Sequence, residues 1–125
     1  MNSRVCILSA LLVLGTASVA NSAESKAVQT ISGILLSLQH MPSAADRQAL
    51  EQIAMDKSAA ADERSIAEAL MHFQHRVVAA DKPMLEAIVN SAKAAGADRT
   101  LAGILLGLHH FPSDADKQKL KLLLQ

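Results

Sequence analysis

The segment Ile31-Ser-Gly-Ile-Leu-Leu-Ser-Leu-Gln-His40-Met-Pro-Ser-Ala-Ala-Asp46 returns without gaps as Leu101-Ala-Gly-Ile-Leu-Leu-Gly-Leu-His-His110-Phe-Pro-Ser-Asp-Ala-Asp116. A weaker copy, Ile66-Ala-Glu-Ala-Leu-Met-His-Phe-Gln-His75, begins midway between them, so the three copies are 35 residues apart. A fixed period of this length is typical of folds in which equivalent supersecondary units pack on one another. The sequence therefore predicts three equivalent structural units.

Each unit is predicted to contain two helices. In the first copy Ile31, Ile34, Leu35 and Leu38 fall at the spacing of one helix face. The same stripe recurs at Ile66, Leu70 and Phe73 and at Leu101, Ile104, Leu105 and Leu108. The second helices carry Leu50 and Ile53, Leu85 and Ile88, and Leu120 and Leu123. No alternating run rich in β-branched residues suggests a strand.

The boundaries of the predicted helices follow from proline and serine. Pro42 and Pro112 end the first helices, because a residue that precedes proline disfavours the helical conformation. Ser43 and Ser113, each followed three residues later by an aspartate, predict capping boxes for the second helices. In the middle copy, the segment Asp81-Lys-Pro83 is expected to start the helix.

The predicted fold class is all-α, with three tandem helical hairpins at about 27–56, 62–91 and 97–125. The period is similar to that of tetratricopeptide repeats, but the resemblance concerns architecture alone. The aromatic and small-residue positions of that family are missing, and proline follows the first helix here. The hairpins could form a short α-solenoid or a compact six-helix bundle. A second apolar side favours stacking, and its residues are Leu36, Met71 and Leu106.

The amino terminus resembles a secretory signal peptide. A positive start with Arg4 precedes an apolar run from Val5 to Leu14, and small residues follow up to Ala20. We expect residues 1–20 to be removed, with Ala23 as a second candidate cleavage position. The apolar run is shorter than the roughly 20 residues of a membrane helix. This predicts a periplasmic or secreted protein with one domain, residues 21–125, and no membrane span after cleavage.

Composition narrows the predicted functions. The 12 basic and 12 acidic residues balance, and the chain has no Trp or Tyr, which argues against nucleic-acid binding. Its one cysteine, Cys6, would leave with the signal peptide, so a thiolate metal site or disulfide is not expected. The sequence contains no nucleophile elbow and no phosphate-binding glycine loop, so we do not expect an enzyme. The leading hypothesis is a non-catalytic interaction module that offers a helical surface to a protein or peptide partner.

All five histidines belong to the first half of their repeats, at positions 40, 72, 75, 109 and 110. Because His40, His75 and His110 share one repeat position, the simpler interpretation is that they end their helices. The helix dipole would then raise each histidine pKa, and stability would fall as pH rises through the histidine range.

The alternative function is the binding or buffering of a divalent metal. Glu68, His72 and His75 are spaced i, i+4 and i+7, which places them on one stripe of a continuous helix. If the first helices lie side by side, His40 and His110 could approach this stripe. A mixed cluster of imidazole and carboxylate groups suits zinc, copper or nickel. No other cofactor is expected.

Overall fold

The computed structural model describes residues 23–125; the predicted signal peptide and cleavage after Ala20 lie outside this range. The described chain is entirely helical, as predicted, with no β-strand within residues 23–125. None of its helices has the length and apolar character to cross a membrane. The six helices are α1 (Lys26–Ser37), α2 (Ala44–Met55), α3 (Ala61–Met71), α4 (Lys82–Asn90), α5 (Gly96–Gly107) and α6 (Asp114–Leu123).

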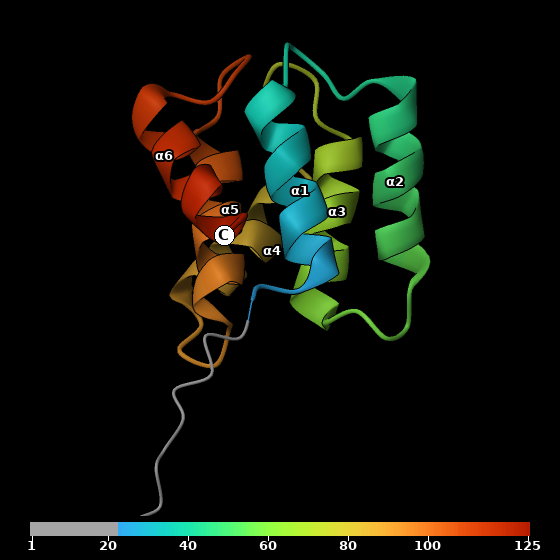
Figure 1. Cartoon of the computed structure of the whole chain (residues 1–125), viewed down its shortest axis with the longest axis vertical. Helices are drawn as coiled ribbons and strands as arrows, with labels where there is room; N and C mark the ends of the chain where they lie inside the picture. The colour runs from blue at the N-terminus through green and yellow to red at the C-terminus, as the bar shows by residue number, and fades with distance from the viewer. Residues whose placement is uncertain (1–22) are drawn as a thin grey trace, which may run out of the picture.

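The helices form a compact bundle (Figure 1). Its helix contacts recur from one repeat to the next and close between the last and the first, which gives approximate three-fold symmetry. The first helices of the repeats, α1, α3 and α5, contact one another in the interior. Each second helix packs mainly on the first helix of the following repeat, α2 on α3 and α4 on α5. The last helix, α6, packs on α1 and so joins the last described helix to the first. The compact bundle is therefore correct, and the indication of a stacked solenoid is wrong.

The apolar stripes explain this closure. An inner helix contacts both other inner helices and also outer helices, so it needs apolar residues on more than one side. Leu36, Met71 and Leu106 are partly buried against the core, which accounts for the second apolar side. The fully buried core includes equivalent residues of all three repeats: Ile31, Ile66 and Leu101; Leu35, Leu70 and Leu105; and Leu50, Leu85 and Leu120.

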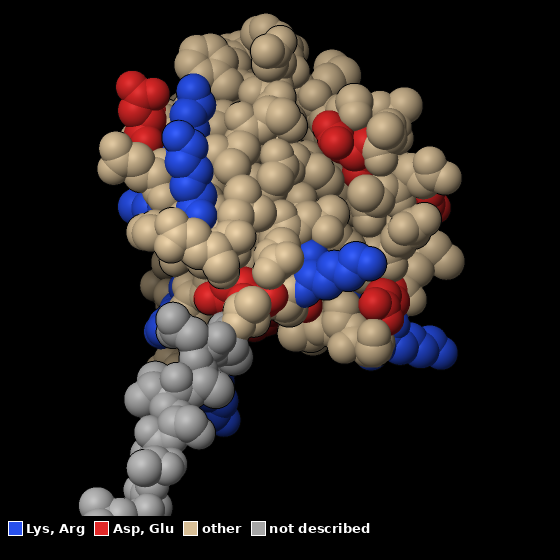
Figure 2. All heavy atoms as spheres, viewed as in Figure 1, with Lys and Arg blue, Asp and Glu red and all other residues tan. Residues whose placement is uncertain are grey.

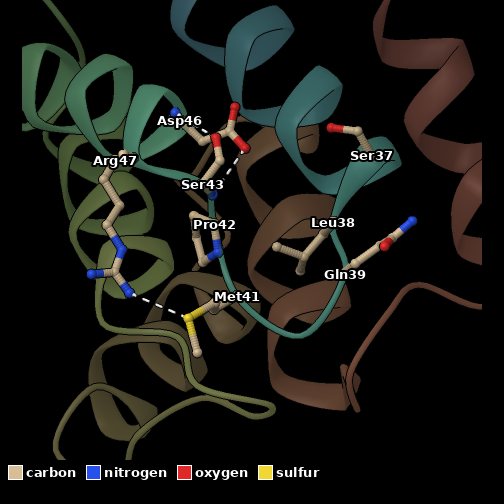
Figure 3. Close-up of a pocket in the computed structure, with 9 residues that line it drawn as sticks. Ser37, Leu38, Gln39, Met41, Pro42, Ser43, Asp46 and Arg47 are labelled. Atoms are coloured by element: carbon tan, nitrogen blue, oxygen red, sulfur yellow. Dashed lines mark hydrogen bonds between the residues drawn. The ribbon is translucent and has the colours of Figure 1, made fainter.

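The predicted helix starts are confirmed with one difference. Ser43 Oγ accepts the Asp46 N–H at 3.1 Å, and Asp46 Oδ2 accepts the Ser43 N–H at 3.2 Å (Figure 3). Ser113 makes the first of these two bonds, to the Asp116 N–H, so only half of its capping box forms. The helix α4 follows Asp81 with proline in its first turn, as expected. These starts fix the length of the turns that connect first and second helices.

Candidate metal centre

The three turns that join first to second helices meet at one end of the bundle, at the top of Figure 1. His40, His75 and His110 lie in these turns, two or three residues beyond the C-caps of their helices. The prediction that they end their helices is wrong, because the chain leaves the helix before it reaches them. All three occupy the left-handed region, with φ of 66°, 63° and 64°, and they are the only non-glycine residues with positive φ in residues 23–125.

A cyclic set of backbone hydrogen bonds connects the three turns. The N–H of His75 donates to the carbonyl of His40 at 2.9 Å, and that of His110 donates to the carbonyl of His75 at 2.8 Å. The N–H of His40 closes the ring by donating to the carbonyl of His110 at 2.9 Å. Each histidine therefore uses both backbone polar groups to position the other two. These three hydrogen bonds hold the three turns next to one another at the approximate three-fold axis.

Two of the histidines lie at the centre of tight, strained turns. The Met41 N–H donates to the Gln39 carbonyl and the Phe111 N–H to the His109 carbonyl, both at 2.7 Å. This i to i+2 bond with positive φ at the central residue defines a γ-turn of the rare, strained kind. A residue with a Cβ atom pays of order 1–3 kcal/mol for such a conformation, whereas glycine adopts it freely. The repeats nevertheless place histidine there, which points to a role for the imidazole.

The three imidazole rings converge above the backbone ring. His110 Nδ1 lies 3.2 Å from His40 Nδ1 and 3.1 Å from His75 Nδ1. The ring centroids are 5.0 to 5.3 Å apart and the rings meet edge to face. One nitrogen from each ring can be chosen so that all three lie within 4.8 Å of one another. We call His40, His75 and His110 the histidine triad.

The triad is exposed, and the pKa of His110 differs from the expectation. Local desolvation lowers the pKa of His110, and the neighbouring His75 and His40 lower it further. A histidine whose pKa falls on folding contributes stability that is lost as pH falls through this range. For His110 the expected rise in pKa is therefore wrong. The causes are local desolvation and then the approach of like groups, in place of a helix C-terminus.

Glu68 and His72 do not join the triad. The helix α3 ends at Met71 and His72 is its C-cap, so the stripe that required a continuous helix from 68 to 75 is broken. His72 Nδ1 instead lies 3.0 Å from Asp81 Oδ2, and Glu68 is exposed on the helix. The expected approach of His40 and His110 to His75 does occur, but it takes place between turns.

Two open cavities flank the turn that carries His40. The larger, of about 560 Å³, is lined by residues of this turn and the start of α2, including Met41 and Arg47 (Figure 3). Arg47 Nη2 lies 3.9 Å from the Met41 sulfur on its wall. The smaller, of about 390 Å³, lies between the first and third repeats and includes His40 in its lining. The smaller cavity therefore adjoins the triad, whereas no triad residue lines the larger cavity.

Charged side chains of both signs are interspersed with uncharged surface on the face shown in Figure 2. A column of basic side chains runs along the side where α6 lies. Comparison with family models, with curated proteins and with solved structures finds no match to this chain.

Proposed function

We propose that this protein is an exported metal-binding protein and that the histidine triad holds one divalent transition-metal ion. The observation that carries the proposal is the convergence of three imidazoles, with the Nδ1 atoms of His40 and His75 both close to that of His110. In a tetrahedral site with Zn–N bonds of about 2.0–2.1 Å, two imidazole nitrogens are about 3.3 Å apart. The triad distances of 3.1 and 3.2 Å are close to this spacing. The turns thus hold two of the three donor pairs at nearly the separation that a metal requires, and one nitrogen from each ring lies within 4.8 Å of the others.

The strained backbone supports the same role. Histidine at all three left-handed positions carries a conformational cost that glycine would avoid. Strain of this kind persists where the surrounding structure enforces it, and the ring of backbone hydrogen bonds does so here. Because the donors are already positioned, binding an ion needs little reorganisation.

The donor set favours zinc, copper or nickel over calcium or magnesium, which prefer oxygen ligands. Three protein ligands leave at least one coordination position open, unlike a closed four-ligand structural site. Since the triad is also exposed, we propose binding or buffering of the ion, without a catalytic role. The interaction with a protein or peptide that the sequence favoured stays a prediction.

Isothermal titration of the untagged, chelator-stripped protein with zinc, nickel and copper tests the proposal. We expect one ion per chain, and we expect His110→Gly to weaken binding at least 100-fold. Glycine suits the φ of 64° at this position, so this variant should keep the fold. The matched control is His109→Ala, which removes the adjacent exposed histidine and should leave the affinity unchanged. Equal losses in both variants, or no binding by the unmodified protein, would overturn the proposal.

A further inference from the structure

The cavity beside His40 forms at the one seam of the bundle that no loop connects. Loops join α2 to α3 and α4 to α5, but α6 and α1 lie at opposite ends of the described chain. The helix α6 packs less extensively on α1 than α2 packs on α3. The cavity of about 390 Å³ lies at this seam, with Leu36 and Gln39 from one side and Phe111 and Lys117 from the other. Its volume is in the range of small-molecule sites.

The cavity and the triad share His40. A metal on three imidazoles retains an open coordination position, and the exposed triad leaves that position accessible. A small molecule in the cavity therefore lies beside the metal and can supply one further ligand atom. This juxtaposition makes the cavity and the ion a single candidate binding site.

The lining indicates the chemistry of such a ligand. The lining is mixed: the polar Ser37 and Gln39 lie beside Leu36, Leu38 and Phe111. Phe111 is 62% exposed, so a bound apolar group would cover its ring. Lys117 carries the only full charge among the lining residues at neutral pH. Its ammonium is 4.0 Å from Asp114, whose side chain is fully exposed, so this ion pair is weak. The ammonium and the metal both favour an anionic oxygen ligand.

We propose that the triad-bound metal captures a small organic carboxylate, whose apolar part lies in the cavity against Phe111 and whose charge is balanced by Lys117. This inference rests on the proposed metal site. The sequence did not identify these two residues as a site. Phe111 is peculiar to the third repeat, since Met41 and Arg76 stand at its position in the other two. Lys117 gave no such signal, because its equivalents Arg47 and Lys82 are also basic.

Titration calorimetry with 3-phenylpropionate as the probe tests the inference on the zinc-loaded protein. We expect binding to the zinc-loaded protein, at least tenfold weaker binding to the stripped protein, and the same weakening with the neutral 3-phenylpropanamide. Lys117→Gln and Phe111→Ala should each weaken probe binding about five- to tenfold and leave zinc affinity unchanged. The matched control is Lys82→Gln, since Lys82 is the exposed equivalent of Lys117 in the second repeat.

The outcomes separate the two proposals. If zinc does not bind, the metal site is wrong and the inference fails with it. If zinc binds but the probe does not, or binds equally to Lys117→Gln, the metal site stands and the carboxylate site is overturned. Amide binding as tight as carboxylate binding would also overturn it.

Discussion

Single residues at both ends of the inner helices are held in conformations or surroundings that cost free energy. At one end, the left-handed φ of the triad histidines imposes backbone strain. At the other end, Asp98 in the first turn of α5 is only 3% exposed, and its Oδ1 has no hydrogen-bond partner. Burial raises the pKa of Asp98 to about 6, and the nearby carboxylates of Glu63, Asp62 and Glu24 add to the increase.

We predict that Asp98→Asn stabilises the protein at pH 7.5 by about 1–2 kcal/mol, because it removes a buried charge whose Oδ1 has no hydrogen-bond partner. In the unmodified protein, folding raises the Asp98 pKa from 3.8 to about 6, so the folded state binds the proton more tightly. The free energy of unfolding should therefore fall as pH rises from about 4 to about 6, by up to about 3 kcal/mol.

Urea denaturation between pH 4 and 7.5 measures this effect. The variant should lose most of the decline that the unmodified protein shows over this interval. Asp114→Asn provides the control, since the Asp114 side chain is fully exposed and its removal should change stability by less than about 0.5 kcal/mol. An Asp98→Asn protein that keeps the full decline would contradict the assignment to Asp98.

At the scale of the helices, serine capping marks where two of the three triad turns end, at the starts of α2 and α6. The reciprocal bonds of Ser43 and Asp46 start α2 directly after the turn that carries His40. The buried Pro42 immediately before the cap fixes the entry of the chain into α2. The cap therefore contributes both to the stability of α2 and to the position of His40, one of the triad histidines.

We predict that Ser43→Ala lowers the free energy of unfolding by about 1 kcal/mol, the usual cost of losing a serine N-cap. Thermal and urea denaturation provide the measurement. The control is Ser37→Ala, which removes an exposed hydroxyl bonded only to carbonyls of its own helix and should change stability by less than about 0.5 kcal/mol. Equal effects of the two substitutions would show that the cap does not stabilise α2.

At the scale of the whole molecule, the bundle closes through the contact of α6 with α1. We therefore expect α6 to contribute as much to the stability of the protein as the other outer helices do. Leu120 of α6 is fully buried, like its equivalents Leu50 and Leu85. In an open solenoid the terminal helix would have only one neighbouring unit. In the closed bundle α6 contacts α5 and also α1, so its core leucine lies between two inner helices, as those of the other outer helices do.

We predict that Leu120→Ala lowers the free energy of unfolding by about 2–5 kcal/mol, as much as Leu85→Ala, and that unfolding stays a single transition. Urea denaturation followed by circular dichroism measures both quantities. Leu122→Ala on the same helix is the matched control, because Leu122 is 65% exposed and should contribute little. A much smaller loss for Leu120→Ala than for Leu85→Ala would indicate that α6 is loosely attached.

The sequence by itself determined the helices, their order and their buried faces. Helical periodicity and proline are local signals, and the repeat places them identically three times, so Leu35, Leu70 and Leu105 were recognisable as one core position. It also singled out His40, His75 and His110 as equivalent. It was wrong about their conformation, because Glu68 and His72 suggested a helix that continued to His75.

Only the tertiary structure decided that the six helices close into a bundle and that the three histidines converge. The packing of α6 on α1 joins segments at opposite ends of the chain, and no local pattern specifies that contact. The bonds among the three turns are equally non-local, since they connect backbone groups of residues 35 and 70 positions apart. Convergence of the imidazoles follows from closure, because three equivalent turns around one axis bring equivalent side chains together.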